Sequence, residues 1–151
     1  MTVDYQLRPA TMEDKEFMMH LEKVNFEKYP NIMELFDEER QKYHYDNYFK
    51  PKHVSIIEYA NRPIGAQSII IRRRDIFIMY QYLLPEFQNK GIDESLIQIA
   101  LQRAKKEQKS VMTCVFKEDT QGKSMCDTLG FELFAQDEIR WRVKWIPPKD
   151  T

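Results

Sequence analysis

Apolar residues recur at helical spacing in the first third of the chain. Phe17, Leu21 and Val24 share one face of a predicted helix, and Thr11–Asp14 before it has the hydroxyl-x-x-carboxylate form of a helix N-cap. Pro30 ends this helix. A second helical stretch follows, with its apolar residues on one side: Ile32, Leu35, Phe36 and Tyr43. We expect one short strand before both helices, Tyr5–Arg8, halted by Pro9.

From Lys52 onwards the pattern is typical of strands. Three β-rich segments, 53–59, 64–71 and 76–84, are separated by the polar turns 60–63 and 72–75. Together they predict an antiparallel meander. The third segment is almost wholly apolar or aromatic, so we expect it to lie centrally in the sheet with both faces covered.

The last third alternates between helices and strands. Gly91 opens a helix whose apolar stripe comprises Ile92, Leu96, Ile97, Ala100, Leu101 and Ala104. The crossover formed by this helix places the next strand, 111–116, parallel to the preceding one. A short helix over 119–129 is capped by Gly130, and segments 131–135 and 139–145 form a closing hairpin. The order β-αα-βββ-α-β-α-ββ predicts an α/β fold with a mixed sheet, formed by residues 1–151 as a single domain.

Composition excludes several classes of function. The chain has 151 residues, with 23 Lys and Arg against 24 Asp and Glu, so no global positive field favours nucleic acid. The sequence contains no apolar stretch of about 18 residues, so we expect no helix that crosses a membrane. The N-terminus lacks the pattern of a signal peptide, and two cysteines suit a reducing compartment, so we expect a cytoplasmic protein. The three histidines show no metal-ligand spacing, and we expect no metal.

The segment 82–93 carries the clearest candidate chemistry. It reads as a strand, a tight polar loop, Gly91 and then a helix. The first turn of a helix has unpaired backbone N–H groups at the positive end of the dipole, so it favours an anion. Gly91 allows close approach, and Lys90 adds a cation. These residues make the loop a candidate phosphate site.

The loop also resembles a known family. Gln88-Asn89-Lys90-Gly91-Ile92-Asp93 is similar to the Gln/Arg-x-x-Gly-x-Gly/Ala signature of the GNAT superfamily of acyl-CoA-dependent N-acyltransferases. The resemblance covers most of the chain, because three further segments are similar to the family's pattern: Arg8–Asp14, Arg62–Gly65 and Leu129–Phe131.

The resemblance implies a reaction and a site. The chain would transfer an acetyl group from acetyl-CoA to a small-molecule or peptide amine, by direct attack in a ternary complex. The pantetheine arm would lie between splayed strands 76–84 and 111–116, and the acceptor beside residues 22–49. A backbone N–H near Leu83 would stabilise the thioester oxyanion. The residues implied to contact the cofactor are Leu83, Leu84, Gln88, Asn89, Lys90, Gly91, Ile92, Asp93 and Asp119.

Three positions depart from the family's pattern. Asp93 stands where the signature has Gly or Ala, and it either points outward or weakens the binding of CoA. Asp119 replaces an Asn that commonly contacts the cofactor arm. Cys126 replaces a Tyr that protonates the leaving thiolate, and it is either a proton donor or a buried core residue.

The acid and the base have other candidates. Tyr80 and Tyr82 alternate onto one face of their strand and are proton donors or packing residues. Glu34 is either the general base or a solvated carboxylate on a helix. A water relay could replace a dedicated base altogether. The alternative function is a non-catalytic binding or regulatory module with a degraded CoA site. A third hypothesis is a homodimer subunit built on the strand that carries Trp141 and Trp145, residues that core packing also explains.

Overall fold

The structure is a computed structural model, and it describes residues 4–149. Its helices and strands confirm most of the elements expected from the sequence. In chain order they are β1 (Gln6–Pro9), η1 (Met12–Asp14), α1 (Lys15–Phe26), α2 (Pro30–Leu35), α3 (Glu38–Tyr48), η2 (Pro51–His53), β2 (Val54–Tyr59), β3 (Arg62–Ile71), β4 (Asp75–Leu83), η3 (Pro85–Phe87), α4 (Ile92–Glu107), β5 (Ser110–Phe116), α5 (Thr120–Thr128), β6 (Glu132–Gln136) and β7 (Arg140–Trp145).

The strands form a mixed sheet of seven in the order β1-β2-β3-β4-β5-β7-β6. β2 pairs antiparallel with β1 and with β3, whereas β4 and β5 are parallel. β7 pairs antiparallel with β5 and with β6. The predicted central position of β4 and the predicted parallel crossover through α4 are therefore confirmed. The expectation that both faces of β4 are covered is wrong, because Met79 is 44% exposed.

The chain divides into two compact units. The first comprises residues 1–68 and 81–92, and the second comprises residues 69–80 and 93–151. β3 and β4 each contribute residues to both units. That residues 1–151 form a single domain stays a prediction.

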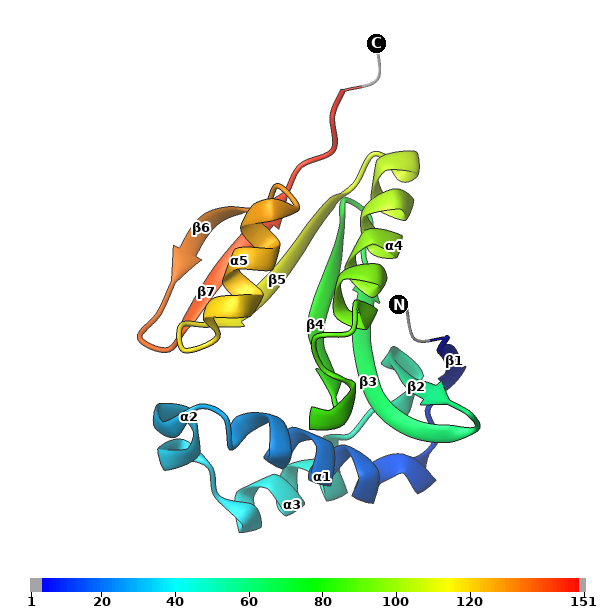
Figure 1. Cartoon of the computed structure of the whole chain (residues 1–151), viewed down its shortest axis with the longest axis vertical. Coiled ribbons are helices and arrows are strands. Elements are labelled where there is room, and N and C mark those ends of the chain that lie inside the picture. The colour runs from blue at the N-terminus through cyan, green and yellow to red at the C-terminus, as the bar shows by residue number, and fades with distance from the viewer. Residues whose placement is uncertain (1–3, 150–151) are drawn as a thin grey trace. The chain divides into compact units, whose positions relative to one another are not determined.

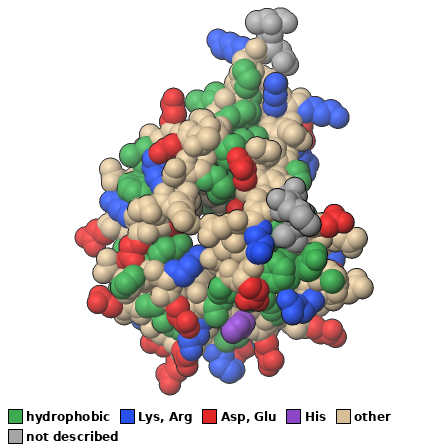
Figure 2. Space-filling view, viewed as in Figure 1, with side chains coloured by type: hydrophobic (Ala, Val, Ile, Leu, Met, Phe, Trp, Pro, Cys, Tyr) green, Lys and Arg blue, Asp and Glu red, His purple; other side chains and the backbone are tan. Residues whose placement is uncertain are grey.

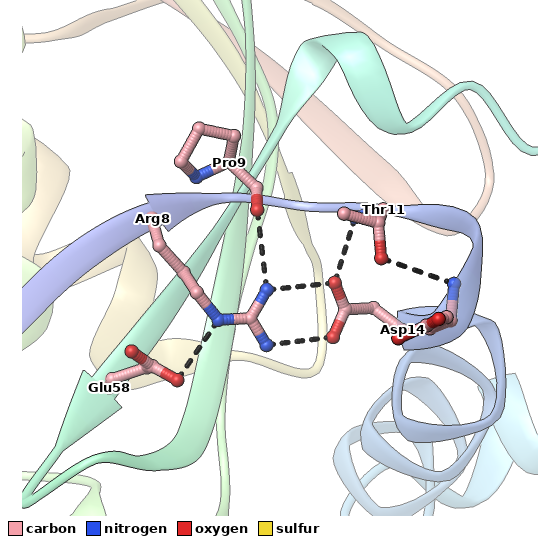
Figure 3. Close-up of polar contacts among 6 residues, drawn as sticks. Arg8, Pro9, Thr11, Asp14 and Glu58 are labelled. Atoms are coloured by element: carbon pink, nitrogen blue, oxygen red, sulfur yellow. Dashed lines mark hydrogen bonds and ion pairs between the residues drawn. The ribbon is translucent and has the colours of Figure 1, made fainter.

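In the first unit, an ion-pair network joins β1 and β2 to the start of the helices (Figure 3). The Arg8 guanidinium donates to both carboxylate oxygens of Asp14, at 2.8 and 2.9 Å, and to Glu58 at 2.9 Å. Asp14 also accepts from the backbone N–H of Thr11 at 2.8 Å, which completes the predicted capping box. Figure 1 shows α1 and α3 side by side in this unit.

The β2–β3 hairpin has a two-residue turn. Ala60 and Asn61 have φ values of 51° and 63°, and Tyr59 pairs directly with Arg62. Positive φ at both central residues is the conformation that matches the twist of the flanking strands. The predicted turn at 60–63 is confirmed, but β3 begins within it at Arg62, so Gly65 lies inside a strand.

The second unit has its own hydrophobic core. α5 lies across β5 and β7 in Figure 1, and Cys126 packs there with Val115 and Val143. The expected stripe of α4 is confirmed by the buried Ile97, Ala100 and Ala104 within this unit. Trp141 and Trp145 are partly buried against the same core, which confirms their interpretation as packing residues.

The parallel pairing of β4 with β5 is short. It joins residues 75–78 to residues 110–113, and both strands continue beyond it. β5 goes on to pair with β7 as far as Phe116. This short ladder agrees with the expected splayed pair.

The prediction of one helical stretch carrying Ile32 and Tyr43 on a shared side is wrong. The stretch forms two helices, because the Asp37 side chain accepts from the backbone N–H groups of Glu39 and Arg40 and caps a new helix. Ile32 is buried, but Leu35 and Tyr43 are 62% and 61% exposed. α3 instead buries Tyr45.

Over residues 4–149, every helix is too short or too polar to cross a membrane.

Candidate functional site

The loop between β4 and α4 has the backbone of a tight, accessible turn. Asn89 and Gly91 have φ values of 61° and 86°, and α4 begins at the next residue, Ile92. A methyl group added at Gly91 would meet no atom within 4 Å. The positive φ favours glycine, and the space around it leaves the backbone open to a ligand.

The charges around this loop have both signs. Lys90 is exposed, while Asp93 and Glu94 occupy the first turn of α4. Acidic residues at this position stabilise a helix by interacting with its positive end. They also oppose a bound phosphate. The backbone of the loop therefore fits a phosphate better than its side chains do.

The side chain of Gln88 contacts the protein beneath the loop. Its Nε2 donates to the Leu83 carbonyl at 2.9 Å and to Asn25 Oδ1 at 3.4 Å. Its Oε1 accepts from Lys28 Nζ at 3.0 Å. Three partners thus hold the side chain of the residue that begins the predicted signature.

Leu83 and Leu84 lie where β4 ends. Leu83 is buried, and its carbonyl accepts from Asn25 Nδ2 at 3.0 Å as well as from Gln88. The Leu84 N–H donates to the Ile64 carbonyl at 2.8 Å. That N–H is therefore engaged, and the oxyanion donor near Leu83 stays a prediction.

Gly65 of β3 permits this arrangement. A Cβ at Gly65 would lie 2.3 Å from the Tyr82 carbonyl oxygen and 3.2 Å from the Leu83 Cα. Opposite it, the pairing of β2 with β3 shifts register after Ile57. The absent side chain therefore lets β3 approach the end of β4 closely.

The two candidate tyrosines are both half-buried on β4. In the first unit, the Tyr82 ring packs edge-on against Phe26, with centroids 6.1 Å apart. Tyr80 belongs to the second unit. Glu34 is exposed on the short helix α2. The catalytic roles of these three residues stay predictions.

Cys126 is a core residue of the second unit. Its side chain is buried, and burial raises the pKa of its thiol to about 11, with further contributions from Asp119 and Asp127. The interpretation of Cys126 as a buried core cysteine is confirmed. A thiol with this pKa is a weaker acid than an ordinary one, and its role as proton donor stays a prediction.

Asp119 caps α5. Its carboxylate accepts from the Gly122 N–H at 2.9 Å, and a Cβ at Gly122 would lie 2.3 Å from the same carboxylate. The residue therefore has a structural function, and its predicted cofactor contact stays a prediction. Among residues 4–149, no group of three or more His, Cys, Asp or Glu side chains could hold a metal ion.

Sequence reasoning missed Asn25. Its side chain is buried on α1, where it donates to Leu83 of β4 and accepts from Gln88 of the loop. A signal was available, because Met18, Leu21 and Asn25 follow the 3-then-4 spacing of a buried helix face. An amide at a position that the pattern reserves for an apolar side chain indicates a buried polar partner.

Comparison with models of protein families identifies one family. Residues 16–131 match the model of the acetyltransferase (GNAT) family. The fold is similar to the crystal structure of PaiA N-acetyltransferase from Thermoplasma acidophilum in complex with coenzyme A, with a TM-score of 0.71 and 17% identity, covering 95% of this chain and 99% of that one.

Two further structures are similar over nearly their whole length. Ard1 from Thermoplasma volcanium has a TM-score of 0.69 and 13% identity, covering 97% of this chain and 100% of that one. An acetyltransferase from Thermus thermophilus has a TM-score of 0.70 and 12% identity, with coverage of 97% and 99%. At these identities the likeness shows the fold. No curated protein matches the sequence.

Proposed function

The chain belongs to the acetyltransferase (GNAT) family, and on that premise we propose that it transfers an acetyl group from acetyl-CoA to a small-molecule or peptide amine. The observation that carries the proposal is the open loop of residues 88–91 at the start of α4, with Gly91 at φ 86°. The acceptor attacks directly, with both substrates bound together.

The residues of the loop fit the pyrophosphate of CoA through their backbone. We propose that N–H groups between Gln88 and Asp93 hold it, with Lys90 as the neighbouring cation. Bound there, acetyl-CoA supplies an activated thioester. Asp93 and Glu94 oppose the phosphate charges, so the affinity is lower than the backbone geometry alone would provide.

Three tasks remain for the protein. A base removes the proton of the attacking ammonium, a donor stabilises the oxyanion, and an acid protonates the leaving thiolate. The Leu83 N–H is the proposed oxyanion donor, because the Leu84 N–H is engaged with Ile64. Tyr80 and Tyr82 are the proposed acids, because the Cys126 thiol is buried with its pKa raised to about 11. Glu34, exposed on α2, or a water relay is the proposed base.

An assay of CoA thiol release, run with a panel of primary amines and of peptides with a free N-terminal amine, tests this activity. We expect release that depends on the amine and saturates with acetyl-CoA. The same assay with the amine omitted measures background hydrolysis. Release no faster than this background with every amine would contradict the proposal if acetyl-CoA binding has been demonstrated separately.

A second candidate function is a non-catalytic binding or regulatory module, and the acidic first turn of α4 favours it. The discriminating variant is Asp93→Gly, with Glu94→Gly as a control that also replaces a carboxylate by glycine in the first turn of α4. If the acetyltransferase proposal is right, the parent binds acetyl-CoA measurably, and Asp93→Gly tightens binding about tenfold, or roughly 1.4 kcal/mol. Calorimetric titration that detects binding only in Asp93→Gly would favour the module.

A further inference from the structure

Asn25 uses both ends of its side-chain amide. The residue lies in the last turn of α1 and is 7% exposed. Its Nδ2 donates to the Leu21 carbonyl of its own helix at 2.9 Å and to the Leu83 carbonyl of β4 at 3.0 Å. Its Oδ1 accepts from Gln88 Nε2 at 3.4 Å. One buried side chain therefore joins a helix, the end of a strand and the first residue of the loop.

These bonds help to fix one peptide group at both ends. The Leu83 carbonyl accepts two amide donors, from Asn25 and Gln88, and the adjoining Leu84 N–H donates to Ile64 at 2.8 Å. A peptide plane held at its oxygen and at its nitrogen cannot rotate without breaking buried hydrogen bonds, each of which costs about 1–3 kcal/mol to leave unpaired. The orientation of the chain entering the loop is thereby set.

Two neighbours of Asn25 reinforce the same contact. The Phe26 ring packs edge-on against Tyr82 at 6.1 Å, and Lys28 Nζ donates to Gln88 Oε1 at 3.0 Å. Residues 25–28 thus meet the end of β4 and the start of the loop at three places. The contacts are specific in direction, because they comprise amides, an ammonium group and an aromatic edge rather than apolar packing alone.

We propose that Asn25 is a positioning residue for the acetyl-CoA loop. By holding the Leu83 carbonyl and the Gln88 side chain, it sets the path of residues 84–91 and so the direction in which their N–H groups point. It also ties this loop to α1, which we expect to lie beside the amine acceptor. This inference rests on the proposed function for its kinetic consequence but not for its structural one.

The chain offers a matched control. Asn47 of α3 donates its side-chain amide to the Tyr43 carbonyl, four residues earlier, at 2.8 Å, as Asn25 does to Leu21. Asn47 is exposed, however. Asn47→Ala therefore removes the same bond within a helix without touching the loop.

The test compares Asn25→Ala, Gln88→Ala and their double variant with Asn47→Ala. For Asn25→Ala we expect the KM for acetyl-CoA to rise about tenfold, with kcat changed less, because the loop amides no longer point in one direction. Asn47→Ala should leave the KM for acetyl-CoA unchanged. The double variant should lose less than the product of the two single losses, since both side chains act on the Leu83 carbonyl.

Two further measurements make the outcome decisive. Without any ligand, Asn25→Ala should shift the Leu83 carbonyl carbon and the Gly91 amide in NMR spectra, and Asn47→Ala should shift neither. If Asn25→Ala does not fold, Lys28→Met removes an exposed partner of Gln88, and a two- to threefold rise in KM is expected.

The results separate this inference from the proposed function. A parent protein that does not bind acetyl-CoA would overturn the function, and the NMR shifts would still decide the positioning role. If the NMR signal of the Gly91 amide is unchanged in folded Asn25→Ala, the positioning role is overturned whatever the activity. An unchanged KM for acetyl-CoA in active Asn25→Ala would overturn it as well. If Asn25→Ala does not fold, an unchanged KM in Lys28→Met would have the same meaning.

Discussion

At the scale of single residues, Gly65 shows how a strand glycine can be required by a neighbouring backbone. A β-carbon there would lie 2.3 Å from the Tyr82 carbonyl oxygen, a distance that real side chains do not reach. From the sequence, Gly65 is the second residue of the predicted strand 64–71, beside the turn at 60–63. The requirement comes instead from β4, and a residue that touches it only after folding leaves no local signal in the sequence.

Cys126 provides a prediction about pH. Burial raises the pKa of its thiol in the folded protein from 9.0 to about 11. Between these values the unfolded chain loses the proton and the folded chain keeps it, so the free energy of unfolding falls as pH rises from about 9 to about 11. The expected loss is about 2–3 kcal/mol at most. Urea unfolding at intervals of pH across this window measures it.

Cys126→Ala should remove this part of the pH dependence, although it lowers stability at neutral pH by creating a small cavity. Cys114→Ala is the matched control, because Cys114 is only half-buried on β5. The difference in unfolding free energy between parent and Cys126→Ala should therefore narrow as pH approaches 11. A constant difference across the window would contradict the prediction.

At the scale of elements, Arg8 determines how β1, β2 and the capped turn before α1 meet. It contacts Asp14 and Glu58, and its hydrogen bonds lower the pKa of the Asp14 carboxyl (Figure 3). The backbone N–H of Thr11 lowers that pKa further. Asp14 is buried, so removing Arg8 leaves a carboxylate with one partner fewer in a poorly solvated place.

Arg8→Met should therefore lower the free energy of unfolding by about 2–3 kcal/mol at pH 7. Arg103→Met is the control, because its pair with Glu107 lies on the surface of α4 and its loss should change the free energy of unfolding far less. The stabilisation from Asp14 is present above the ordinary carboxyl pKa of 3.8 and is lost as pH falls through its lowered value. Equal losses in the two variants would show that the network contributes little.

The helices of the first unit show where element boundaries were readable and where they were missed. Thr11 and Asp14 predict the start of the first helix correctly, because a capping box is a local sequence pattern. Asp37, followed by Glu38 and Glu39, is an equally local signal for the start of α3, but the spacing of Ile32 and Tyr43 predicts one continuous helix across it. The helical spacing between apolar residues on either side of a helix break has no structural meaning, because each of the two helices has its own buried side.

At the scale of the whole molecule, charge is nearly balanced, at −1, and both signs are interspersed on the face shown in Figure 2. The proposed affinity for acetyl-CoA would therefore come from local geometry rather than from a general positive field. We propose that residues 81–92 of the first unit provide that geometry, with the loop and its support from α1. A homodimer stays a prediction, which sedimentation would test.

Ligand binding provides a test at this scale. Acetyl-CoA at about 100 times its dissociation constant should add about 2.7 kcal/mol to the free energy of unfolding. For a chain of this length the melting temperature should rise by roughly 5–10 °C. A melting scan with millimolar acetyl-CoA measures this, and inorganic phosphate at the same concentration controls for general phosphate effects. A melting temperature unchanged by acetyl-CoA would count against binding.

The sequence by itself determined the order of the strands, the mixed sheet, the helices α1, α4 and α5, and the loop before α4. These depend on local physics: the period of apolar residues, the proline and glycine stops, and the residues that cap helices. The family signature at 88–93 is local as well. Even its altered position, Asp93, could be read directly.

The tertiary structure alone decided which groups of the site are engaged. The Leu84 N–H donates to Ile64, the Gln88 side chain contacts Asn25, and the Cys126 thiol lies in a core. Asn25 and Gln88 are separated by 63 positions in sequence. Hydrogen bonds over such separations depend on how strands and helices pack, and burial sets the pKa of a thiol only once its neighbours are in place.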